Sequence, residues 1–132
     1  MIVTVSELVK EHEAIERELF ELDTVIHSSI INYPNLSHVL KRLKTIWDSH
    51  EEKEELFFNA LHEKGFTIPV KKITFEHGKL ERDLDMLLRV LHSGNEDEMH
   101  TVLFKYGKDL AENIRKHMAD EDWIFYALPK HS

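Results

Sequence analysis

The chain has 132 residues, 42% of them hydrophobic, which fits one folded domain spanning residues 1–132. It has no cysteine, which excludes a disulfide framework, a thiolate metal site and an iron–sulfur cluster held by this chain. The formal charge of −8 argues against nucleic acid as a partner, and the absence of a signal peptide and of a long apolar run predicts a cytoplasmic protein with no membrane association.

Four helices are predicted from the helical spacing of the apolar residues, and no segment has the pattern of a strand. Thr4 and Glu7 form a capping box for the first helix, Asn35 and Ser37 are candidate caps of the second, and Gly65 can end it. Long helices joined by short loops are antiparallel neighbours, so we expect an all-α, up-down-up-down four-helix bundle. The predicted helices cover residues 5–29, 36–64, 68–93 and 97–128.

Each predicted helix has an apolar stripe that is interrupted by one histidine, namely His12, His50, His77 and His117. Glu54 and Glu121 follow on the same stripes, although an unpaired buried carboxylate is very costly. At about 1.5 Å per residue, counting from the helix ends places the four imidazoles in one layer. The other histidines are expected on the surface, and they are His27, His38, His62, His92, His100 and His131.

The two halves of the chain repeat this design. EHEAIERELFEL around His12 resembles EHGKLERDLDML around His77, at an offset of 65 residues. HEEKEELFFNAL from His50 resembles HMADEDWIFYAL from His117, at an offset of 67 residues. The repeat predicts two helical hairpins that face each other across a pseudo-two-fold axis.

A metal site explains why these helices bury imidazoles and carboxylates together. Both groups are ligands of borderline and hard divalent metals, and coordination offsets the cost of burying them. Four histidines and two glutamates are too many for one tetrahedral zinc, but they suit two ions with terminal histidines and bridging carboxylates. The Glu-x-x-His motif of ferritin-like centres is absent, because no histidine has a glutamate three residues before it.

The ordered set of motifs resembles the hemerythrin-like (HHE cation-binding) domain family over nearly the whole chain. The segments HEEKEELFF and HMADEDWIFYALP also resemble segments typical of the family. The resemblance implies a non-haem di-iron centre with an oxo, hydroxo or water bridge and a position open to a small ligand. It assigns the bridging carboxylates to Glu54 and Glu121, and the motifs that carry it are His12, His50-x-x-x-Glu54, His77 and His117-x-x-x-Glu121.

The chain departs from the family's oxygen carriers in the third helix. They have a His-x-x-x-His pair there, whereas the residues at this spacing from His77 are Ile73 and Glu81. Glu81, or its repeat mate Glu16, is a candidate for the missing ligand, which would make the centre richer in carboxylate. Each lies one step off its apolar stripe, so a salt bridge with Arg or Lys at the helix boundary is the preferred explanation of both. Weaker candidates for that ligand are Tyr106 and Tyr126.

Two further assignments stay open at this point. Oxygen carriers often have His-x-x-x-x-Asp in the fourth helix, so Asp122 competes with Glu121 as the bridge, although the apolar stripe favours Glu121. Trp47 and Trp123 are expected to pack in the core or at its boundary.

Three functions are compatible with such a centre. The preferred one is a protein that binds or senses oxygen, nitric oxide or peroxide, or that buffers iron, with a redox or signalling partner protein for its output. The second is an oxidoreductase that acts on peroxide or nitric oxide or donates iron for cluster repair; no motif for an electron-donating cofactor is visible, so an enzyme is not preferred. The third is a helical interaction module with a structural metal. The oligomeric state is left open.

Overall fold

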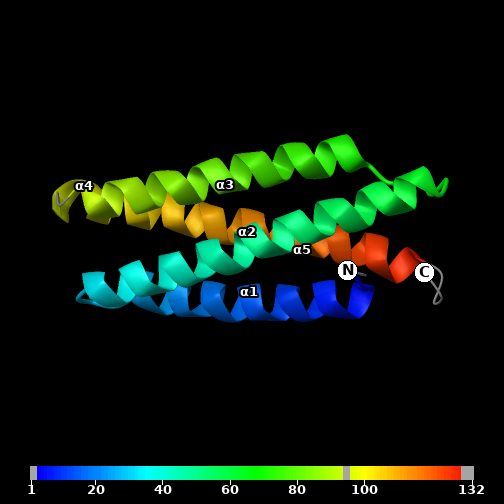
Figure 1. Ribbon diagram of the computed structural model, residues 1–132. Helices are drawn as coiled ribbons and strands as arrows, with labels where there is room; N and C mark the ends of the chain where they lie inside the picture. The colour runs from blue at the N-terminus through cyan, green and yellow to red at the C-terminus, as the bar shows by residue number, and fades with distance from the viewer. Residues whose placement is uncertain (1–2, 94–95, 129–132) are drawn as a thin grey trace.

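The computed structural model describes residues 3–93 and 96–128, which form a bundle of four long helices (Figure 1). Neighbouring helices run antiparallel, so α1 begins and α5 ends at the same end of the bundle (Figure 1). The described residues contain no strand. The predicted all-α, up-down-up-down bundle is therefore confirmed. The helices are α1 (Val5–Ile26), α2 (Tyr33–Glu63), α3 (Val70–His92) and a fourth made of α4 (Glu96–Val102), the π-helical segment η1 (Leu103–Gly107) and α5 (Lys108–Ala127).

Two predicted helix ends are formed as the local sequence indicates. The Thr4 hydroxyl oxygen accepts a hydrogen bond from the backbone N–H of Glu7 at 3.2 Å, which caps α1. Gly65 follows α2 with a φ of 97°, a backbone conformation that glycine adopts without steric cost. There the N–H groups of Lys64 and Phe66 both donate hydrogen bonds to the carbonyl of Leu61, each at 3.1 Å, which closes the last turn of the helix.

The start of α2 differs from the prediction. The helix begins at Tyr33 instead of residue 36, because Asn32 is its N-cap and accepts a hydrogen bond from the N–H of Asn35 at 3.0 Å. Pro34 lies in the first turn, where its missing N–H would have no partner within the helix. The prediction of Asn35 or Ser37 as the cap was therefore wrong.

The sequence predicts one continuous α-helix over residues 97–128. The structure instead divides the fourth helix into three segments. Five residues of it, Leu103–Gly107, form a π-helical segment. A Cβ atom added at Gly107 would lie 3.1 Å from Cδ1 of Ile26, so the absence of a side chain lets this helix approach α1 closely. Leu103 and Gly107 are both buried, so the apolar spacing continues through the segment and does not reveal the widened turn.

The core consists of two hydrophobic clusters with a polar layer between them. The larger cluster contains Trp47 and the leucines on the α4 side of that layer, and the smaller one lies toward the start of α1 and the end of α5. In the smaller cluster, the repeat mates Phe58 and Phe125 stack with ring centroids 5.5 Å apart. Burying a side chain of this kind contributes roughly 1.5–3 kcal/mol, so two apolar blocks hold the polar layer in place.

One of the two tryptophans predicted for the core or its boundary lies on the surface. Trp47 is 1% exposed, whereas Trp123 is 73% exposed, because Glu121 and Phe125 occupy the inward face of α5 on either side of it. The histidines predicted for the surface are exposed where they are described, and His131 lies outside the described residues.

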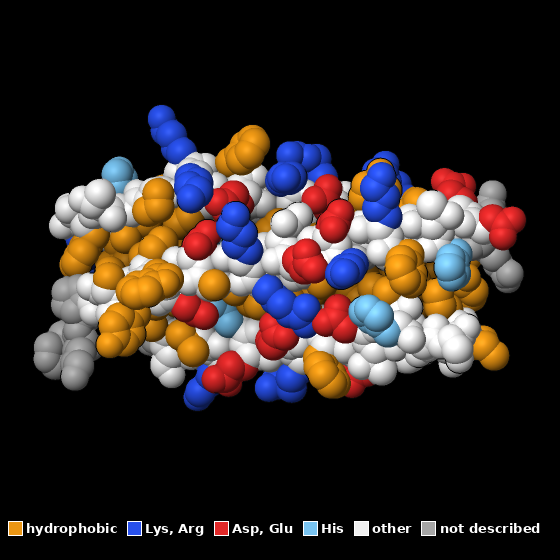
Figure 2. Space-filling view, turned by 180° about the vertical axis from the view of Figure 1, so that it is seen from behind, with side chains coloured by type: hydrophobic (Ala, Val, Ile, Leu, Met, Phe, Trp, Pro, Cys, Tyr) orange, Lys and Arg blue, Asp and Glu red, His pale blue; other side chains and the backbone are white. Residues whose placement is uncertain are grey.

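Acidic and basic side chains are interspersed along the face in Figure 2. Among the described helices, none combines the length and the apolar character needed to cross a bilayer.

Candidate metal centre

Six polar side chains meet in the layer between the two hydrophobic clusters. Each is at most 5% exposed, and together they come from all four long helices. Their ligand atoms form two groups, and within each group these atoms lie within 4.8 Å of one another. Both groups contain Glu54 and Glu121; the first adds His12 and His50, and the second adds His77 and His117.

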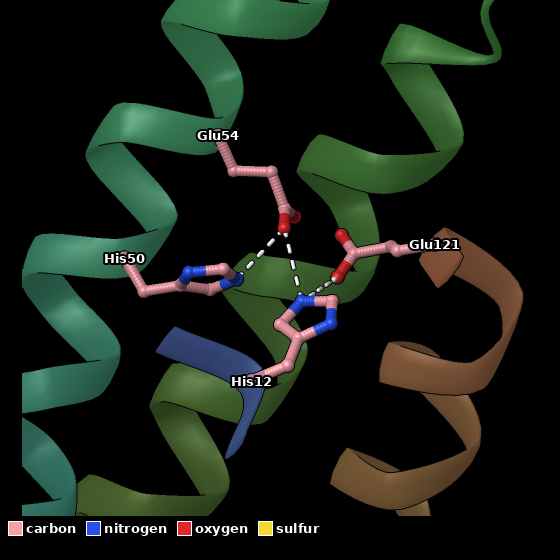
Figure 3. Close-up of side chains that lie close together, drawn as sticks. All are labelled: His12, His50, Glu54 and Glu121. Atoms are coloured by element: carbon pink, nitrogen blue, oxygen red, sulfur yellow. Dashed lines mark hydrogen bonds and ion pairs between the residues drawn. The ribbon is translucent and has the colours of Figure 1, made fainter. Parts of the chain in front are cut away.

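The first group is drawn in Figure 3, where the four side chains point toward one another. Nε2 of His50 lies 2.7 Å from Oε2 of Glu54, one turn along the same helix. Nε2 of His12 lies 3.3 Å from that same oxygen and 3.2 Å from Oε1 of Glu121. Two imidazole nitrogens therefore face two carboxylates from three different helices.

The second group repeats the first with the roles of the hairpins exchanged. Nε2 of His117 lies 2.7 Å from Oε2 of Glu121 on its own helix. Nε2 of His77 lies 3.2 Å from that oxygen and 2.9 Å from Oε1 of Glu54. Each glutamate thus turns one oxygen toward each group, which is the arrangement that a carboxylate bridging two metal ions requires.

The contacts inside the layer are short, but several of them are not hydrogen bonds. Nε2 of His50, Nε2 of His117 and Oε1 of Glu121 are buried and have no hydrogen-bond partner, although carboxylate or imidazole atoms lie close to them. Buried polar atoms are rarely left unpaired in this way. Close ligand atoms without hydrogen bonds are expected where each group of atoms surrounds a metal ion. The residues of the two groups therefore fit a pair of metal ions.

A second set of carboxylates holds the outer nitrogens of three histidines. Such partners orient an imidazole and leave its other nitrogen free to bind a metal. They increase the basicity of the ring as well. The pairs are His12 with Asp122 at 2.8 Å, His50 with Glu11 at 2.9 Å and His117 with Glu76 at 3.1 Å, each measured from Nδ1 to a carboxylate oxygen.

His77 is the exception among the four histidines. Its Nδ1 is buried without a hydrogen-bond partner, and Oε1 of Glu55 lies 3.9 Å away. Glu55 is the repeat mate of Asp122, so the pseudo-two-fold pattern is present but looser here. Of these outer carboxylates, only Asp122 was among the predicted site residues, and it was considered there as a bridge. The signal was an acidic residue before His12 and before His77, and another after each bridging glutamate.

The remaining candidates fall outside both groups. Glu16 forms an ion pair with Arg115 at 3.0 Å, as the salt-bridge alternative predicts. Glu81 is partly buried at the rim of a pocket lined by acidic residues, and the structure does not bring it into either group. Asp122 is 52% exposed and holds His12, whereas Glu121 is shared by the two groups. The tyrosines are exposed, Tyr106 by 43% and Tyr126 by 86%.

The electrostatics of the layer follow from its burial and its carboxylates. Burial alone would lower the pKa of His12 and His77, but hydrogen bonds and charge interactions with Glu121 and Glu54 outweigh it and raise each pKa to about 10. Burial alone would raise the pKa of Glu54, yet its contacts with Glu121 and with three histidines hold it well below the ordinary value. Without metal, the Glu54 carboxylate is therefore neutralised by protonated imidazoles.

Aromatic rings close the layer on both sides. The Trp47 ring lies 6.3 Å from His50, 5.7 Å from His77 and 6.0 Å from His117, measured between ring centroids. On the opposite side, the Phe125 ring lies 5.7 Å from His12. These rings exclude bulk water from the ligand atoms, which strengthens the electrostatic interactions among them.

Comparisons with known proteins agree with this geometry at the level of the family. No curated protein and no solved structure matches the chain. The family described as "Hemerythrin HHE cation binding domain" matches residues 3–128, a range that contains every residue of both groups. Metal-cation binding is therefore the property that the family and the buried cluster have in common. The chain belongs to the hemerythrin family of HHE cation-binding domains.

Proposed function

We propose that this protein holds two non-haem iron ions, one in each ligand group, and uses them to bind or sense oxygen, nitric oxide or peroxide, or to buffer iron. The observation that carries the proposal is that two buried groups share both of their carboxylates, Glu54 and Glu121. A single ion needs no such sharing. Four histidines with two carboxylates also exceed what a tetrahedral zinc site uses.

The chain itself supplies four ligands to each ion, two imidazole nitrogens and two carboxylate oxygens. When bound, iron would supply Lewis acidity, a change of oxidation state and coordination positions that these residues leave open. Glu11 and Glu76 hold the rings of His50 and His117 so that Nε2 faces inward. Trp47 keeps bulk water away from three of the imidazoles. The protein thus provides a dry, preorganised site for the two ions.

The test is the metal content of untagged protein, purified without chelators after growth with iron. About two irons per chain are expected, and His50→Ala or Glu121→Ala should lose them. His38→Ala, a change at an exposed histidine outside the layer, serves as the matched control and should retain both. A folded chain that contains no metal and takes up no ferrous iron under anaerobic conditions would refute the proposal.

The kinetics of the iron-loaded protein then separate the possible functions. Spectral changes with oxygen, nitric oxide or peroxide, without sustained consumption of the ligand, support binding or sensing. Steady-state consumption of peroxide or nitric oxide in the presence of an electron donor would instead show an oxidoreductase. If removing the metal changes neither the fold nor the binding of a partner protein, the bundle is an interaction module with a structural metal.

A further inference from the structure

An acidic pocket lies between α2 and α3 beside the proposed centre. Its volume is about 340 Å³, and five carboxylates line it. Lys44 lies near one edge, where it pairs with Asp48 at 3.2 Å and with Asp85 at 2.9 Å. The five carboxylates belong to Asp48, Glu51, Glu52, Glu55 and Glu81.

The His77 imidazole, which is fully buried, faces these carboxylates. One of its nitrogens and one oxygen each from Glu51 and Glu55 lie within 4.8 Å of one another. Nδ1 of His77 and Oε2 of Glu51 are both buried without a hydrogen-bond partner. Ligand atoms that share an ion, with bonds of about 2.0–2.2 Å, stand roughly 3–4 Å apart. The 3.9 Å separation of His77 Nδ1 and Glu55 Oε1 fits that spacing.

The pseudo-two-fold repeat gives this pocket a counterpart between α5 and α1, where the residues differ. The repeat mate of Asp48 is Arg115 and the mate of Glu51 is Met118. Arg115 neutralises Glu16, the mate of Glu81, at 3.0 Å. One face of the centre is therefore neutralised by an arginine, whereas the other keeps its carboxylates together.

We propose that Glu51, Glu55 and Nδ1 of His77 form a third divalent-cation site, through which ferrous ions pass to the dinuclear centre. The inference rests on the proposed function, because it needs a centre to be filled. Nε2 of His77 faces Glu54 and Glu121, so the same ring borders both sites. A cation held in the pocket is therefore separated from the centre by one imidazole ring.

The first test follows anaerobic uptake of Fe²⁺ by metal-free protein in stopped flow, with Trp47 fluorescence as the signal in a Trp123→Phe background. Glu51→Gln should slow uptake at least tenfold, since charge-lined clefts raise association rates by about 10–10³. The final content of two irons per chain should not change. Glu13→Gln is the control, because this exposed residue has the same charge and lies outside the pocket. An unchanged rate, equal slowing by both variants, or a final content of one iron would overturn the third site.

The second test separates failure of the third site from failure of the centre. His50→Ala with His117→Ala removes one nitrogen from each group of the centre and leaves the pocket intact. Mn²⁺ binding, followed by the loss of the free-ion electron paramagnetic resonance signal, should still show one weak site. Adding Glu55→Gln should weaken that site at least tenfold, and adding Glu13→Gln should not. A folded double variant that binds no Mn²⁺ refutes the third site, whereas wild-type protein that takes up no iron refutes the proposed centre.

Discussion

Filling the centre should release protons, because the metal-free layer is neutralised by them. The carboxylates Glu54 and Glu121 raise the pKa of His12 and of His77 to about 10. At pH 8 both rings are therefore protonated. A metal ion binds only the deprotonated nitrogen, so loading displaces about two protons per chain. Between about pH 7 and pH 9, the affinity for the pair of ions should rise roughly 100-fold per pH unit, since two protons compete with the metals.

Calorimetry measures this proton release directly. Anaerobic titration of metal-free protein with Fe²⁺ at pH 8, in two buffers that differ in ionisation enthalpy, gives the number of protons released per chain. His38→Gln changes an exposed histidine and should match the wild type. A wild-type count close to zero would show that the buried imidazoles are already neutral, and it would refute the electrostatic account of the layer.

Three further predictions follow from the surroundings of the layer. Metal loading should quench the emission of Trp47 reversibly, because its ring lies beside the ligand histidines. Trp47→Phe should abolish the change in emission, and Trp123→Phe should not. Quenching that survives Trp47→Phe would contradict the observed packing. Glu11→Gln removes the charge that orients His50 and should weaken metal affinity about 10- to 100-fold in a chelator competition assay, whereas an equal loss in the exposed variant Glu13→Gln would point to overall charge instead. Phe125→Ala should lower the free energy of unfolding of the metal-free protein by about 3–5 kcal/mol in urea, and a loss below about 1 kcal/mol would mean that the smaller cluster contributes little.

The helices and the ligand layer could be predicted because both follow from spacing alone. A histidine on an apolar stripe, with a glutamate one turn later, sets which side chains face the core, as for His50 and Glu54. The length of each helix then sets their common depth. The antiparallel bundle is the arrangement that brings such stripes together. The apolar spacing therefore predicts both the fold and the convergence of these side chains.

Other features depend on tertiary contacts that spacing does not contain. The π-helical segment ends at Gly107, which lies close to α1, and the apolar pattern runs through the segment unchanged. Trp123 is a large aromatic residue of the kind that often packs in a core, but Glu121 and Phe125 occupy the inward positions of its helix. Glu11 contacts His50 on the next helix rather than its neighbour His12, so its role emerges only when the two helices are placed side by side.

The sharing of both glutamates makes the two ions mutually dependent. Glu54 belongs to one hairpin and Glu121 to the other, and each contributes an oxygen to both groups. Neither hairpin can therefore assemble a complete binding site by itself, and an ion in one position fixes the carboxylates for the other. Filling is expected to be cooperative, with chains that hold a single ion scarce at intermediate metal concentrations. The metals then act as cross-links between two halves of a duplicated structure, and a ligand lost from one hairpin weakens the hold of both.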